Sequence, residues 1–192
     1  MRHVPIVLEN EGQHERSYDI YSRLLRDRII LINSEFDEHL SATVCAQLMF
    51  LNAEDPDAEI TVYINSGGGH VMDGLAIMDT MNLIQAPVKT VAMGLAASMG
   101  AFLLSCGKKR CATPECRIMI HQVSAGSRGT CADMAIEMKE VEYLNTRLAT
   151  IMAKNSGKTV AQLKKAMDRN NWMSAKEAKE FGLIDEVLGE RE

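Results

Sequence analysis

The chain has 192 residues, of which 46% are hydrophobic and 24% charged, a size and composition typical of one compact domain. Its formal net charge is −5 and its basic residues are interleaved with acids, so no basic stripe for binding nucleic acid phosphates is present. No apolar run is long enough to span a bilayer or to form a signal sequence. We therefore expect a cytoplasmic protein with no nucleic acid or membrane partner.

Strand patterns alternate with helix patterns along the chain, which favours an α/β fold with a parallel sheet. The apolar run within 26–33 is bounded by polar residues, as in a buried strand. In chain order, the predicted elements are a strand at 26–33, a helix from Ser34 that ends at 54–57, a strand at 59–65, a helix at 71–84, a strand at 88–93, a helix opening at 99–104, a strand at 117–121, a helix at 131–154, a helix at 174–182 and a strand at 183–187.

The two helices nearest the C-terminus carry the clearest signals. Apolar residues recur every three to four positions from Met134 to Met152, which predicts a long amphipathic helix. Ser174 and Glu177 form the S-x-x-E pattern of a capping box, and Gly182 follows as a helix stop.

The cysteines indicate free thiols and not disulfides or a metal site. They are odd in number and without C-x-x-C spacing, in a chain that carries no secretory signal. Cys111 and Cys116 could be considered zinc ligands, but no second Cys or His pair completes a tetrahedral site. We expect no metal and no organic cofactor. The residues concerned are Cys45, Cys106, Cys111, Cys116 and Cys131.

Two turns between a predicted strand and the following helix could carry chemistry. One is Gly67–Gly69, and the other places Ser98 between Ala97 and Met99. At a helix N-terminus, a hydroxyl beside a backbone N–H is the arrangement that acyl transfer requires. The alternative is structural, because serine caps a helix more often than it acts as a nucleophile, and A-x-S-x-G lacks the first glycine of the nucleophile elbow.

His121 ends the predicted strand 117–121, and ligands of a parallel sheet bind at the carboxyl ends of its strands. Both glycine-containing turns lie at the same edge. His121 is therefore a candidate general base, although a histidine beside an apolar run is often a hydrogen-bonded structural residue.

Several segments resemble the Clp protease proteolytic subunit. In this order and spacing they are SYDIYSRLLRDRIILI, YINSGGGHVMDGLAIMDTM, GLAASMGAFLLSCG, RIMIHQ and DRNNWMSAKEAKEFGLIDEV. The resemblance covers nearly the whole chain. It implies one peptidase domain over 1–192 with the crotonase-like α/β fold, a spiral of ββα units. It also implies a flexible axial segment at 1–17, a protruding handle at about 122–154, and heptameric rings that stack into a double ring.

By the same resemblance, Ser98 is the nucleophile, His121 the general base, and the N–H groups of Gly68 and Met99 the oxyanion hole. The implied activity is that of a serine endopeptidase which degrades unfolded polypeptides with an AAA+ unfoldase. Tyr63, Thr61, Leu83, Val91 and Met93 occupy the positions at which the unfoldase would dock.

The chain departs from the family pattern at several points. Asn170 stands where the family has the catalytic aspartate, while Asp168 and Arg169 match its Asp-Arg pair at the contact between rings. Gly67 replaces a proline in the S-P-G-G turn, which loosens it by ~0.5–1 kcal/mol of unfolded-state entropy. Thr61 replaces an aromatic docking residue. Val123 replaces the proline of H-Q-P, and the loop 107–116 is about two residues shorter than in the family.

These departures leave two readings open, and a third stands against the resemblance. The first is an active endopeptidase with a Ser98–His121–Asn170 triad. The second is a weakly active or structural subunit that requires a paralogous ring with a complete Ser-His-Asp triad. The third is a crotonase-type acyl-CoA enzyme, against which Ser98, His121 and the lack of a basic patch for CoA phosphates count.

Overall fold

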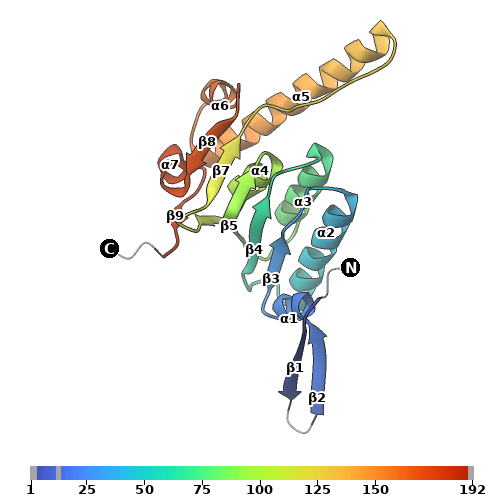
Figure 1. Ribbon diagram of the computed structural model, residues 1–192, viewed down its shortest axis with the longest axis vertical. Helices are drawn as coiled ribbons and strands as arrows, with labels where there is room; N and C mark the ends of the chain where they lie inside the picture. Colours follow the sequence, from blue (N-terminus) through green and yellow to red (C-terminus); the bar gives the residue numbers. More distant parts are fainter. Residues whose placement is uncertain (1–3, 12–13, 190–192) are drawn as a thin grey trace.

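The computed structural model describes residues 4–11 and 14–189, which form a twisted sheet with helices packed against it and two projections (Figure 1). The strands are β1 (Ile6–Glu11), β2 (His14–Asp19), β3 (Ile29–Ile32), β4 (Ile60–Ser66), β5 (Val88–Ala97), β6 (Lys109–Ala112), β7 (Arg117–Ile120), β8 (Asn171–Ser174) and β9 (Glu186–Val187). The helices are α1 (Ile20–Arg26), α2 (Glu38–Glu54), α3 (Val71–Leu83), α4 (Met99–Ser105), α5 (Cys131–Ser156), α6 (Val160–Ala166) and α7 (Ala175–Phe181).

The main sheet is parallel over most of its width, as the alternation of strands and helices predicts. Its order is β3-β4-β5-β6-β9, with β7 parallel to the second half of β5. Only β8 is antiparallel, and it pairs with β7. The predicted mixed α/β class with a parallel sheet is therefore confirmed.

Strand β4 shows how the sequence divides the two faces of the sheet. Ile60, Val62 and Ile64 are fully buried under the helices, whereas the alternate residues Thr61 and Tyr63 are only partly covered. The buried set continues into α2, α3 and α4 as one core cluster. Parallel sheets are usually covered on both faces, so the face that carries Thr61 and Tyr63 is available for a partner.

Strand β5 is irregular in the middle, and this irregularity brings the ends of β5 and β7 together at one edge of the sheet. Gly94 has φ 67°, and the pairing register between β4 and β5 shifts between Ile64 and Ser66. A side chain at Gly94 would meet Asn65 Oδ1 at 3.1 Å, and this oxygen accepts the N–H of Leu95 at 3.3 Å. Beyond this irregularity, β5 leaves β6 and pairs with β7. The strand ends that precede Ser98 and His121 therefore lie side by side.

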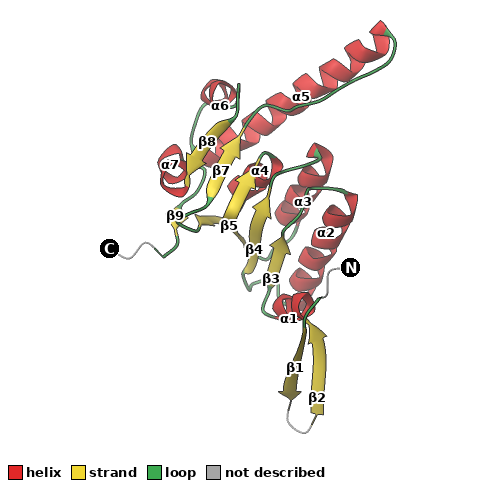
Figure 2. Cartoon of the chain, viewed as in Figure 1, coloured by secondary structure: helices red, strands yellow, loops and turns green. Residues whose placement is uncertain are grey.

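The long helix predicted at 131–154 is confirmed as α5, which projects from the sheet (Figure 2). Only its last third is anchored, through the buried residues Leu148, Ala149, Met152 and Ala153. Nearer its start, Ile136, Met138 and Tyr143 are 65%, 56% and 61% exposed. The projecting part therefore presents apolar side chains to solvent.

Helix ends follow local capping chemistry. The capping box of Ser174 and Glu177 is present at α7, and Gly182 ends that helix in the left-handed conformation, both as predicted. Helix α2 begins later than the predicted Ser34, because the Asp37 carboxylate accepts the N–H of Leu40 and makes Asp37 the N-cap.

Other elements were not predicted from the sequence. These are the β1–β2 hairpin, α1, α6, β6 and β8, which are all short. The predicted strand 183–187 is reduced to two residues, because only Glu186 and Val187 pair with β6. The predicted flexible axial segment 1–17 stays a prediction, and within it residues 1–3 and 12–13 lie outside the described part.

Candidate active site

Ser98 connects β5 to α4 in an unusual backbone conformation. Its φ is 55° and its ψ is −119°, and within 4–11 and 14–189 the only other non-glycine residue with positive φ is Arg28. Such strained residues persist only where the surrounding structure holds them, and they concentrate at functional sites. Here the Ser98 N–H donates to the Met119 carbonyl of β7 at 2.9 Å, and the Ser98 carbonyl accepts from Phe102 at 3.0 Å. The sharp turn presents the hydroxyl at the strand edge, as a nucleophile elbow does.

The structure brings Ser98 and His121 together. His121 follows the last residue of β7, and its Nε2 lies 2.8 Å from Ser98 Oγ. Both residues are half-buried. When Nε2 accepts the hydroxyl proton, Nδ1 carries the other ring proton, so this geometry suits a general base next to a nucleophile.

The glycine turn lies directly against Ser98. Gly68 has φ 107°, and a Cβ added to it would lie 2.6 Å from Ser98 Cβ and 3.1 Å from Met99 N. Met99 is the first residue of α4, so its N–H has no intrahelical acceptor. The Gly68 carbonyl accepts from Phe36 N–H at 2.8 Å, which fixes the turn.

The two predicted oxyanion donors therefore lie beside Ser98, but they differ in their present bonding. Gly68 N–H donates to Ser66 Oγ at 3.2 Å, whereas Met99 N–H is free of intrahelical bonding. For Gly68 to bind a substrate oxygen, it must exchange its serine partner for that oxygen. The oxyanion assignment stays a prediction.

An apolar pocket opens beside the dyad. Its walls come from α3, α4, α5 and the chain after β7, and they include Val71, Phe102, Val123, Leu148, Met152 and Met167. Its volume is only about 50 Å³, below the range of sites that hold a whole ligand, so it has room for a small apolar group. None of these residues was predicted to line a pocket, because for those on α3, α4 and α5 the helical spacing indicates only core packing.

The third predicted triad residue is near His121 but is not hydrogen-bonded to it. The antiparallel register of β7 and β8 pairs Ile120 with Asn171, which places Asn170 opposite His121 one step beyond the ladder. Both residues line an open cavity together with Asp168 and Arg169. Among the hydrogen bonds of residues 4–11 and 14–189, none joins Asn170 to His121. The role of Asn170 stays a prediction.

Asp168 and Arg169, predicted to contact a second ring, are exposed next to the site. Arg169 Nε lies 4.0 Å from Asp168 Oδ2, and Arg169 also donates to the Asp168 carbonyl. Both side chains are available to a partner.

The predicted docking residues fall on more than one surface. Thr61 pairs with Lys89 and Tyr63 with Val91 across β4 and β5, on the sheet face that the helices leave uncovered. Met93 follows on the same face of β5 and is partly buried, while Val91 is fully buried. Leu83 lies at the end of α3 and is 79% exposed. The docking role of these residues is untested.

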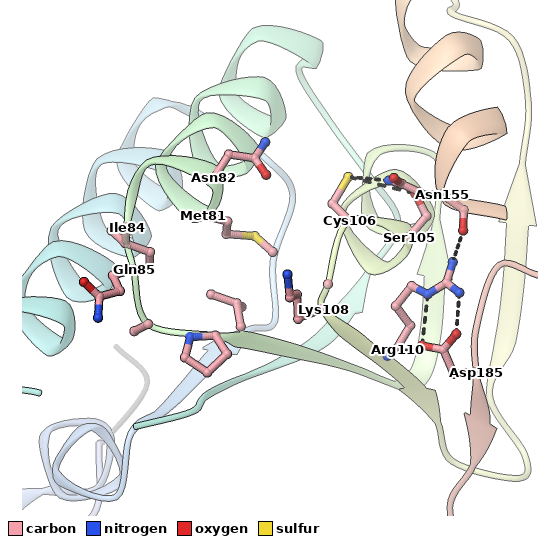
Figure 3. A pocket seen from close by; sticks show the side chains of 14 residues that line it. Met81, Asn82, Ile84, Gln85, Ser105, Cys106, Lys108, Arg110, Asn155 and Asp185 are labelled. Carbon is pink, nitrogen blue, oxygen red and sulfur yellow. Dashed lines mark hydrogen bonds and ion pairs between the residues drawn. The ribbon is translucent and has the colours of Figure 1, made fainter. Parts of the chain in front are cut away.

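Another cavity, shown in Figure 3, is lined by Val88 at the start of β5 and so lies at the opposite end of this strand from Ser98. Its volume is about 470 Å³, within the range of ligand sites, but the Arg110 guanidinium that lines it is already engaged by acceptors of the protein itself. Arg110 donates to both Asp185 carboxylate oxygens and, at 2.6 and 3.0 Å, to the carbonyls of Asn155 and Gly182. This cluster is a structural junction between β6, α5 and the C-terminal segment.

Two of the thiols are poor nucleophiles because they are buried. Burial raises the pKa of Cys106 to about 12 and that of Cys116 to about 11, so both stay protonated at neutral pH. All five cysteines are free thiols, and no group of three metal-binding side chains occurs in the part of the chain that the structure describes. Within that part, no helix combines the length and apolar character needed to cross a bilayer.

Comparison with protein families agrees with this geometry. The family model described as Clp protease matches residues 12–191. The match includes both strand-to-helix turns, the strand that precedes His121, the projecting helix and the segment with Asn170.

Proposed function

Because this match shows that the chain belongs to the Clp protease family and has its crotonase-like fold, we propose that it is a proteolytic subunit in which Ser98, His121 and Asn170 form the catalytic triad. The family is one of serine peptidases. The single observation that carries the proposal is the 2.8 Å contact between Ser98 Oγ and His121 Nε2 at a strained strand-to-helix turn.

The geometry supports a two-step acyl transfer. Ser98 Oγ attacks the carbonyl carbon of the scissile peptide bond while His121 Nε2 takes the hydroxyl proton. The oxyanion forms beside Met99 N–H, with Gly68 N–H as the second donor. The proton on Nε2 then passes to the leaving amine, which departs and leaves the acyl-serine. Water, deprotonated by His121, hydrolyses this ester and restores Ser98.

The substrates that fit this site are unfolded polypeptides. The apolar pocket beside Ser98 accepts a small apolar side chain next to the scissile bond. We place the site inside a chamber of two stacked heptameric rings of self or paralogous subunits, fed by an AAA+ unfoldase. The exposed apolar residues of α5 support the ring assembly, and the uncovered sheet face with Tyr63 supports docking. Free thiols are in keeping with a cytoplasmic location.

We further propose that the subunit has low activity alone. Asn170 has a neutral amide and is not bonded to His121 in the described structure, so the imidazolium that forms during acylation lacks a carboxylate partner. A paralogous ring with a complete Ser-His-Asp triad would then supply most of the activity.

Hydrolysis of a short fluorogenic peptide tests both parts of the proposal. The purified chain, its Ser98→Ala variant, and mixtures of each with a complete-triad paralog are compared at equal ring concentration. We expect slow hydrolysis by the chain alone, none by the variant, and faster hydrolysis in the mixtures. Equal rates for the chain and its Ser98→Ala variant, each assayed alone, would refute the proposed site.

A further inference from the structure

The two residues that follow His121 are each held by a side-chain hydrogen bond. Strand β7 ends at Ile120, and residues 121–130 form neither helix nor strand. Gln122 Nε2 donates to the Asp168 carbonyl at 2.9 Å, and Val123 N–H donates to Asn145 Oδ1 at 3.2 Å. The backbone on the C-terminal side of the catalytic histidine is therefore fixed by these side chains and not by a sheet.

The two sides of the dyad are thus held in different ways. Ser98 is bonded through its N–H to Met119 within the sheet, so the nucleophile moves with β7. His121 lies one residue beyond the last ladder pair of β7 and β8. A misplacement of about 1 Å between catalytic groups can reduce a rate by ~10²-fold, so whatever holds the chain after His121 also sets the activity of the dyad.

Asn145 is suited to this role by its place on α5. It is half-buried and lies three residues before Leu148, the first buried residue of the anchored part of the helix. Its neighbour Thr146 points elsewhere, since Thr146 Oγ1 accepts from Lys164 Nζ at 2.9 Å. The hydrogen bond that Asn145 accepts from Val123 therefore links the anchored part of the projecting helix to the segment that follows His121.

We propose that Asn145 is a positioning residue for His121, acting through Val123, with Gln122 as the second anchor on the Asp168 loop. The inference rests on the proposed peptidase function, because it concerns the reactivity of the same dyad. Asn145 touches neither substrate nor reacting atoms. Its part is to keep His121 Nε2 within hydrogen-bonding distance of Ser98.

The test compares two variants of Asn145 with one variant of its neighbour Thr146. Asn145→Leu keeps the size but removes the acceptor, Asn145→Asp keeps the acceptor, and Thr146→Val is the matched control on the same helix. The rate of Ser98 labelling by a fluorophosphonate and the kcat and KM for a fluorogenic peptide are measured, with assembly mass and thermal midpoint checked for each protein.

We expect Asn145→Leu to lower the labelling rate and kcat about three- to tenfold with KM unchanged, the effect of one lost hydrogen bond on the position of the base. Asn145→Asp and Thr146→Val should stay within about twofold of wild type. A merely structural role would instead lower the thermal midpoint or raise KM, and Asn145→Asp would not restore the rate.

Equal labelling of wild type and Asn145→Leu overturns the inference while the proposed function stands. If the wild-type chain is not labelled at all, the proposed function fails, and the inference that rests on it fails as well. The two failures are therefore distinguishable by the wild-type reaction alone.

Discussion

At the scale of single residues, the site depends on two neighbouring backbone conformations. Ser98 adopts a positive φ that a serine rarely accepts, and Gly68 adopts one that only glycine adopts easily. Because Gly68 packs against Ser98, each fixes the space available to the other. Gly67 differs, since an added Cβ there meets nothing within 4 Å and its φ lies outside the left-handed region.

Alanine substitution should therefore lower peptide hydrolysis at one of these two adjacent glycines and not at the other. Gly68→Ala should reduce peptide hydrolysis by roughly 10²-fold or more, because its Cβ displaces Ser98 and disturbs the N–H proposed as an oxyanion donor. Gly67→Ala should preserve hydrolysis and raise the free energy of unfolding by ~0.4–1 kcal/mol, since it restricts only the unfolded chain. Peptide assays and urea unfolding of both variants give the comparison. Equal activity of the two variants would show that the turn does not border the reacting atoms.

Asn170 is the residue that we propose for the third position of the triad, where a Ser-His-Asp triad has a carboxylate. Asn170→Asp should raise kcat by about tenfold or more, because a carboxylate stabilises the imidazolium and selects the correct tautomer, an effect worth ~10⁴ in the serine-protease precedent. Peptide hydrolysis is measured at matched assembly mass, since Asp168 and Arg169 lie beside the mutation. A stable variant that is no faster than wild type would show that the third triad position does not limit this subunit.

At the scale of secondary structure, the sequence predicts long elements better than short ones. The periodicity of α5 and the capping box at Ser174 are local signals, and both are confirmed. The four-residue strands β6 and β8 are defined by their pairing with β5 and β7, distant segments of the chain, which no local pattern records. The same limit applies to the site: Ser98 and His121 follow recognisable strand ends, whereas Asn145 is found only from its contact with Val123.

The C-terminal elements are held by the ion pair of Arg110 with Asp185, which predicts a pH dependence of stability. Hydrogen bonds from Arg110 hold the pKa of Asp185 below its usual value. Because the pKa of Asp185 is lower in the folded chain than in the unfolded chain, the ion pair stabilises the fold at pH values above the unfolded pKa of ~3.9. This stabilisation is lost as the pH falls through the folded pKa.

Wild type should therefore have a higher thermal midpoint than Asp185→Asn at pH 7, and this difference should shrink as pH falls below about 4. Thermal unfolding of both proteins from pH 7 to pH 3 measures it. Glu115→Gln, a change at an exposed carboxylate, serves as the control and should not reproduce the trend. A difference that persists undiminished at pH 3 would exclude the ion pair as its cause.

At the scale of the whole molecule, two surfaces of the single chain are not covered by its own helices. The sheet face with Tyr63 is not covered by helices, and α5 exposes large apolar side chains along its projecting part. Exposed apolar side chains gathered on one element, as on α5, often mark an interaction site. The isolated fold therefore points to an assembly, in keeping with the Clp protease family.

Light scattering should give a mass far above the 21.3 kDa of one subunit, with about seven subunits in each cyclic ring. Replacement of Ile136 and Met138 by Glu should lower that mass, because the charges would fall within the contact that covers α5. The same two substitutions would leave the mass unchanged if α5 is not an interface. A monodisperse monomer of the wild-type chain at micromolar concentration would contradict the assembly directly.

The central claim is that Ser98 is an activated nucleophile paired with His121. The most direct test is to treat the folded chain with a fluorophosphonate and to map the modified residue by mass spectrometry of its peptides. We predict a single modification at Ser98, lost in Ser98→Ala and strongly reduced in His121→Ala. Labelling that persists in Ser98→Ala, or none in the intact wild-type assembly, would contradict the account.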